Sequence, residues 1–152
     1  MKTLARQPCK AEVLRRLRTV RSDSAARWGR MTAHQMVCHL SDACRMALGE
    51  KTVSSATGPL QRTLVKWIAL YTPLRWRAGI VTRPEIDQQC GGTKPGDFAA
   101  DVAELERLVE VIATRTEDSQ WPPHPIFGTM SHRLWLRWAY LHIDHHLRQF
   151  GA

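Results

Sequence analysis

Apolar residues recur every three or four positions along most of this chain, which is the spacing of one face of an α-helix. Helix-end signals support the same segments. Thr32 followed by Gln35 forms a capping-box pattern, and Asp97 is a good N-cap residue. Pro59 suits a first helical turn, while Gly49 suits a helix end. The pattern predicts five helices, over residues 8–20, 32–49, 59–73, 97–112 and 131–150.

No convincing strand-like alternation of apolar and polar residues lies between these segments. We therefore predict an all-α fold, most economically a four-helix bundle with an additional helix, formed by residues 1–152 as a single domain. Residues 75–96 contain prolines and glycines and show no sustained period. We expect a long ordered loop there, of a length that often carries function or covers a site.

Composition narrows the class of protein. Hydrophobic residues make up 43% and charged residues 24% of the chain, which is ordinary for a globular protein. The net charge of +8 comes mostly from arginine. Because no helix-turn-helix, zinc finger or aromatic-basic strand accompanies it, we interpret the charge as a solvated basic face and expect no nucleic acid partner.

Other classes of protein are also disfavoured. The four cysteines are scattered without a Cys-x-x-Cys pair, which argues against a zinc ribbon or a dense disulfide framework. No apolar run approaches the 18 or so residues of a membrane span, and the N-terminus does not resemble a signal peptide. We expect a cytoplasmic protein that does not act at a membrane.

Histidines concentrate in the last predicted helix, where His142, His145 and His146 lie within five residues. At 100° per residue, His142 and His146 fall within about 40° of Trp135, at the centre of the apolar stripe. On the same wheel His145 falls at the flank, and Asp144 points to the opposite side.

Two inward imidazoles four residues apart can reach one ion, since their Cβ atoms are roughly 5 to 6 Å apart. Buried imidazoles need partners, and either a shared metal or two separate hydrogen bonds would satisfy His142 and His146. Residue 143 is Ile rather than Glu, so the His-Glu-x-x-His pattern of zinc peptidases is absent.

His39 is the best candidate for a third ligand. It lies in the second predicted helix, at the margin of the apolar arc and next to Gln35 and Asp42 on the wheel. His34 points to the polar side of that helix. Cys38 lies about 100° round the helix from His39, so we do not count it as a ligand.

These segments resemble the DinB/YfiT-like superfamily of bacterial four-helix-bundle metalloenzymes. The closing stretch resembles a largely uncharacterised branch of it, while residues 51–96 contribute nothing specific. The resemblance rests on Trp28-Gly29-Arg30-Met31-Thr32-Ala33-His34-Gln35-Met36-Val37-Cys38-His39-Leu40, on His124-Pro125-Ile126-Phe127-Gly128, on Trp135, and on His142-Ile143-Asp144-His145-His146-Leu147-Arg148-Gln149-Phe150-Gly151.

The resemblance implies that His39, His142 and His146 bind a divalent metal, zinc or nickel. Asp42 and Gln149 are then candidates for orienting an imidazole. Three protein ligands leave a position open for water or substrate. Relatives in the superfamily include transferases that use a low-molecular-weight thiol cosubstrate, and many form homodimers.

Two functions remain open from the sequence. One is a metal-dependent enzyme acting on a small-molecule substrate, by thiol-dependent transfer or by hydrolysis. The other is a noncatalytic helical bundle, in which the histidines are structural, hold a structural metal, or accompany a partner-binding face.

Overall fold

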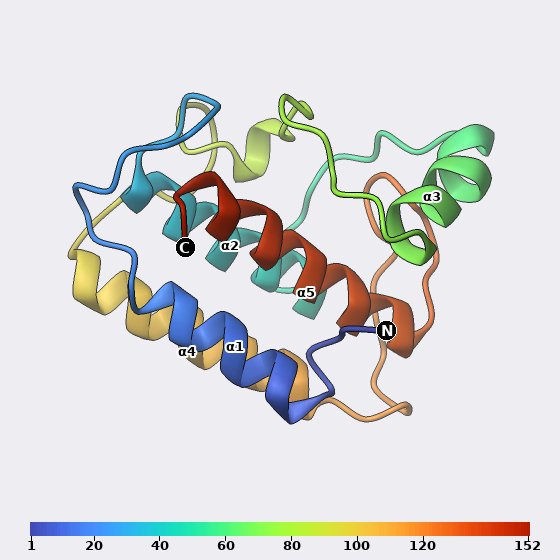
Figure 1. The fold of residues 1–152 in the computed structure, drawn as a ribbon. Coiled ribbons are helices and arrows are strands. Elements are labelled where there is room, and N and C mark those ends of the chain that lie inside the picture. The colour runs from blue at the N-terminus through green and yellow to red at the C-terminus, as the bar shows by residue number, and fades with distance from the viewer.

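Four helices pack around one core in the computed structural model, which describes all residues 1–152 (Figure 1). They are α1 (Gln7–Leu17), α2 (Ala33–Leu48), α4 (Phe98–Thr114) and α5 (His132–Gln149). Helices α2 and α1 each contact both α4 and α5. The structure contains no strand, only an isolated antiparallel bridge between His124 and Gly128. The prediction of an all-helical fold is confirmed.

Local side-chain chemistry fixes where the helices begin. The Thr32 hydroxyl accepts the Gln35 N–H at 3.1 Å while the Gln35 side chain accepts the Thr32 N–H at 3.0 Å, so the predicted capping box is present. Asp97 caps α4, and Ser131 caps α5. The first helix ends at Leu17, three residues before the predicted end, although Val20 is still buried.

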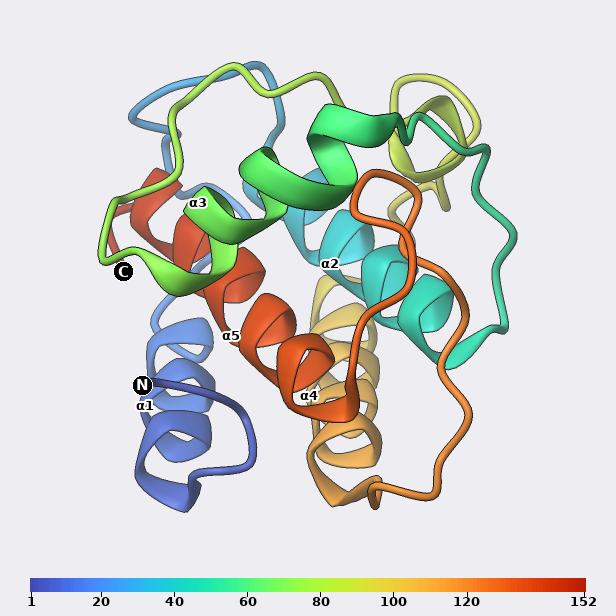
Figure 2. The same ribbon diagram turned by 90° about the vertical axis from the view of Figure 1, so that its right-hand side faces the viewer.

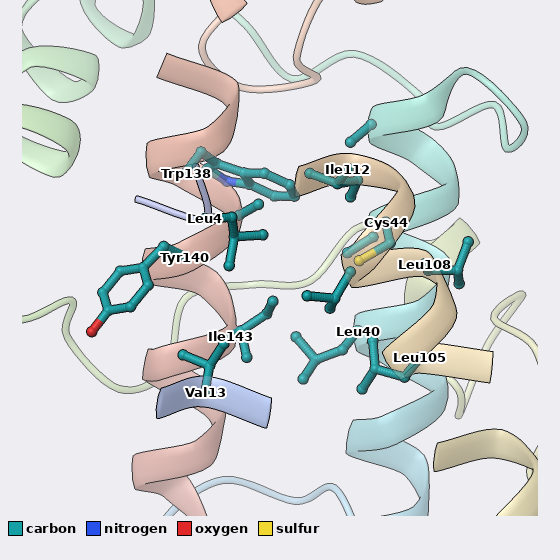
Figure 3. Packing of buried hydrophobic residues seen from close by; sticks show 14 of the residues in the cluster. Leu4, Val13, Leu40, Cys44, Leu105, Leu108, Ile112, Trp138, Tyr140 and Ile143 are labelled. Atoms are coloured by element: carbon teal, nitrogen blue, oxygen red, sulfur yellow. The ribbon is translucent and has the colours of Figure 1, made fainter. Parts of the chain in front are cut away.

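The core is built mainly from the facing sides of α2, α4 and α5, with α1 and the N-terminal Leu4 closing one side (Figure 3). Leu40 and Cys44 of α2 meet Leu105 and Leu108 of α4, and this is the most extensive helix pair. Full burial of one large apolar side chain stabilises the folded state by roughly 1.5 to 3 kcal/mol. This core holds α2 and α5 side by side, which brings His39 of α2 close to His142 and His146 of α5.

The third predicted helix lies mostly at the surface. It consists of a π-helical turn, η1 (Gln61–Val65), followed by α3 (Lys66–Tyr71), and it crosses over α5 (Figure 2). Only Leu70 of α3 is buried, and nine of the ten exposed large hydrophobic side chains of the chain lie between Leu60 and Val81. The periodicity therefore located the helix but did not show which face is covered.

The predicted long loop is present between α3 and α4. It contains one short 3₁₀ turn, η2 (Pro84–Ile86), which contacts α2. No helix is both long enough and apolar enough to cross a lipid bilayer.

Candidate metal centre

Three histidines from two helices meet between α2 and α5. His39 comes from α2, and His142 and His146 come from successive turns of α5. One ring nitrogen of each lies within 4.8 Å of the other two. The ring centroids are 5.1 Å apart for His39 and His142, and 4.8 Å apart for His39 and His146. The structure thus brings together the three residues that the sequence singled out.

The spacing of the rings fits a divalent ion. Two nitrogens each about 2.0 to 2.1 Å from a tetrahedral ion lie about 3.3 Å from one another. The Nε2 atoms of His39 and His142 are 3.2 Å apart. This pair already has the separation of two ligands on one ion, and a ring nitrogen of His146 lies within 4.8 Å of both.

A backbone carbonyl fixes the ring of His39. Its Nδ1–H donates to the carbonyl oxygen of Ile86 at 2.7 Å. Because a carbonyl can only accept, the proton must be on Nδ1, which leaves a lone pair on Nε2. The Ile86 carbonyl belongs to η2, so the long loop supplies one of the groups that orient the site.

A side-chain amide fixes the ring of His146 in the same way. The Nε2 of Gln149 donates to the carbonyl oxygen of Trp28 at 2.7 Å, so its Oε1 faces His146 and accepts from Nδ1 at 2.8 Å. The lone pair of His146 is therefore also on Nε2. Gly29 makes room for this bridge, since a Cβ there would lie 2.6 Å from the Gln149 Nε2 and the backbone has φ +80°.

Burial keeps the three rings neutral. It lowers the pKa of His39 below its usual value, and it lowers the pKa values of His142 and His146 well below theirs, with neighbouring imidazoles adding to the effect. Neutral imidazoles are the form that binds metal. Without a cation at the centre, His142 can satisfy only one of the two facing Nε2 lone pairs by donating to it. The donor set therefore fits a divalent metal.

Two tryptophan rings lie beside His142, the most exposed histidine of the cluster. His142 is only partly buried, and its ring centroid lies 5.0 Å from Trp138 and 6.1 Å from Trp76. Trp76 comes from the loop after α3, where its indole N–H donates to the Ala69 carbonyl at 2.9 Å. The long loop thus covers the site as well as orienting it. Sequence reasoning did not single out either Trp76 or the Ile86 carbonyl.

The helical wheel placed His142 at the centre of the apolar stripe and His145 at its flank. In the structure His145 is buried and His142 is only partly buried. His145 is as buried as His146, at 8% exposure each, but its ring contacts Trp28 and Trp76 and is not part of the three-histidine cluster. His142 is the most exposed of the three clustered histidines, and the Trp76 ring lies beside it. Asp144 does not face solvent as predicted. It pairs with Arg16 of α1 at 2.7 Å and with Arg148 at 3.0 Å.

Asp42 acts on the site through the loop rather than through an imidazole. It is fully buried, and its carboxylate accepts hydrogen bonds from the side chain of Gln88 and from the backbone and hydroxyl of Thr93. Its hydrogen bonds reach no histidine. They hold residues 88–93 against α2, and so they keep the Ile86 carbonyl in place for His39.

A second cluster of donor atoms lies on another face of α2. Asp101 of α4 accepts from the ring of His34 at 2.7 Å and from the Cys38 thiol at 3.6 Å. Burial raises the pKa of Cys38 to about 12, which keeps it a thiol and a donor. The sequence placed His34 on a polar side, and the structure shows that α4 covers this side. These bonds tie α2 to α4.

Replacing Gln149 tests its proposed part in orienting His146. We expect Gln149→Met to weaken divalent metal binding by about 10- to 100-fold, the usual cost of losing a group that orients a ligating histidine. Gln149→Glu keeps an acceptor for the Nδ1 proton and should lose less. Competition titrations against a chromogenic chelator measure both. Equal losses in the two variants would assign Gln149 a packing role only.

The fold and the site together define an all-helical protein with a buried three-histidine cluster that could bind a divalent metal. A family model described as "Protein of unknown function (DUF1569)" matches residues 6–152, and the chain belongs to this family. No curated protein and no solved structure matches the chain.

Proposed function

We propose that this chain is a divalent-metal-dependent enzyme of the DinB-like four-helix-bundle type, with His39, His142 and His146 as the ligands. One observation carries the proposal: three neutral imidazoles converge, and the Nδ1 protons of two of them are held by fixed acceptors so that Nε2 is free to bind an ion. The helix order agrees with the resemblance, since one ligand comes from the second helix and two come from the last.

The three histidines suit a first-row divalent metal ion that keeps one coordination position free. Imidazole ligands suit zinc, copper, iron and nickel, and the resemblance favours zinc or nickel among these. Three protein ligands leave room for a further group. A divalent ion bound there would supply Lewis acidity and lower the pKa of a coordinated water or thiol. Trp76 and Trp138 border the accessible ring of His142, so they would exclude bulk water and contact a small-molecule substrate.

Two reaction classes follow from that chemistry. Thiol-dependent transfer needs a low-molecular-weight thiol cosubstrate, and hydrolysis needs only water. Metal-loaded protein should either conjugate such a thiol to a fluorogenic electrophile or hydrolyse an activated ester. His142→Ala should abolish that activity, whereas Asp118→Ala should not, because Asp118 is exposed and is not part of the three-histidine cluster. Activity that persists in metal-free protein would contradict the proposal.

A structural metal is the second candidate, because the ion would cross-link α2 and α5 near the core. Removing the metal distinguishes a structural role of the ion from a catalytic one. The core of 28 buried hydrophobic residues does not depend on an ion, so we expect chelator-treated protein to keep its helical circular dichroism. An ion present at about 1,000 times its Kd stabilises a fold by roughly 4 kcal/mol, so Tm should fall by about 10 °C. Unfolding at 25 °C on metal removal would instead favour the structural role.

A further inference from the structure

The segment His124–Gly128 forms a closed turn that the metal site does not use. His124 and Gly128 exchange backbone hydrogen bonds of 2.8 and 2.9 Å. The His124 ring folds back into the turn, where its Nδ1 accepts the backbone N–H groups of Ile126 at 3.1 Å and Phe127 at 3.2 Å. Because Nδ1 accepts two bonds, the ring proton must be on Nε2.

The Nε2–H of His124 is a donor without a partner in the protein. The residue is 5% exposed, and Nε2 is not among the fully buried polar atoms that lack a partner. His124 is one of the residues that line a surface pocket of about 460 Å³. Burial lowers the pKa of His124 to about 3, so the ring is a neutral donor at neutral pH.

Two cations line the same pocket. Arg62 and Lys66 lie one turn apart on the η1–α3 segment. The Arg62 Nε donates to the Thr57 hydroxyl at 3.1 Å, and the Lys66 Nζ donates to the Thr129 carbonyl at 3.1 Å. Neither forms an ion pair, and no acidic residue lines the pocket.

Gly128 brings Arg62 close to the turn. Its φ of +66° is in the left-handed region, and a Cβ there would lie 3.4 Å from the Arg62 Cγ. A side chain at this position would strain the backbone and would lie in van der Waals contact with the Arg62 chain. The glycine therefore permits the left-handed turn beside Arg62, and its backbone bonds to His124 close that turn.

We propose that this pocket binds a small anion, a carboxylate or a phosphate group, through Arg62, Lys66 and the Nε2–H of His124. Arg62 and Lys66 have no acidic partner, so their positive charge is available to an anion. The neutral His124 ring, whose proton is fixed on Nε2, would add a directional hydrogen bond. The pocket is separate from the metal centre: the Trp138 ring lies between them, with its centroid 5.0 Å from both His124 and His142. The proposal does not depend on metal binding.

The first test follows the ring of His124 in the wild-type protein. Sodium phosphate and sodium acetate are titrated separately at constant ionic strength, with chloride as the balancing ion, while long-range ¹H–¹⁵N spectra report the histidine nitrogens. We expect the His124 Nε2 resonance to be that of a protonated nitrogen before anion is added. It should shift saturably with Kd on the order of 1 mM, a reasonable affinity for a ligand of a few heavy atoms. Response to phosphate alone identifies a phosphoryl group, and response to acetate alone a carboxylate.

The second test uses variants that remove one charge each. Arg62→Gln and Lys66→Gln should each weaken anion binding by about 10-fold, which is the cost of losing one charge-assisted hydrogen bond. Arg77→Gln is the control, because it makes the same charge change at an exposed arginine outside the pocket. Three results would overturn the proposal: no saturable response to either anion, binding that leaves His124 unmoved, or equal weakening by Arg77→Gln.

Discussion

His146→Ala should lose divalent metal while its neighbour His145→Ala keeps it. The two side chains form a matched pair, since they are adjacent on α5 and equally buried at 8% exposure. Only His146 has a nitrogen in the three-histidine cluster. A structural or generic loss of packing would affect both variants alike, whereas loss of a ligand affects one.

The size of the effect follows from the energy of a ligand bond. A four-ligand zinc site is worth about 10 to 16 kcal/mol, or roughly 3 to 4 kcal/mol per ligand. Since 1.4 kcal/mol is tenfold in affinity, we expect His146→Ala to weaken zinc binding by about 100- to 1,000-fold. Competition with a chelator of known affinity measures both variants. Equal affinities for His145→Ala and His146→Ala would remove His146 from the site.

Asp42→Ala should destabilise the fold more than any other single carboxylate removal. The carboxylate is fully buried and makes hydrogen bonds to Gln88 and to Thr93, and the Lys51 ammonium lies 3.1 Å from Oδ1. Removing it leaves these donors unpaired. Breaking a buried charged network typically costs about 3 to 5 kcal/mol in the free energy of unfolding, which corresponds to a fall in Tm of about 10 °C.

Urea unfolding of the metal-free proteins measures this cost without a contribution from bound ion. Asp118→Ala is the control, because Asp118 is exposed and unpaired and should change the free energy by less than about 0.5 kcal/mol. Metal affinity of Asp42→Ala should fall as well, because the loop that carries the Ile86 carbonyl loses its anchor. A destabilisation below about 1 kcal/mol would contradict the role assigned to Asp42.

The features that sequence could predict are those set by local chemistry. The capping box of Thr32 and Gln35 depends on residues three apart, and the structure reproduces it. The placing of His142 and His146 on one side of a helix needs only the helical period, and the two rings do meet. Both features can be calculated without knowing any tertiary contact.

The features that sequence missed depend on contacts between distant segments. Asp144 was predicted to point away from the apolar stripe, and Arg16 of α1 pairs with it there, which a helical wheel does not show. The Ile86 carbonyl that His39 contacts lies in a loop more than forty residues away in sequence, which Asp42 helps to hold against α2. The apolar positions of the third predicted helix located that helix, but most of them are exposed, which their spacing does not show.

Elemental analysis of protein purified without a nickel column or affinity tag tests the three-histidine assignment most directly. The wild type and the His142→Ala, His146→Ala double variant are expressed and measured side by side. We predict about one equivalent of a divalent metal ion per wild-type chain, because a preformed site with three ligands should keep its ion during purification. The double variant should contain none. Stoichiometric metal that survives both substitutions would contradict the assignment.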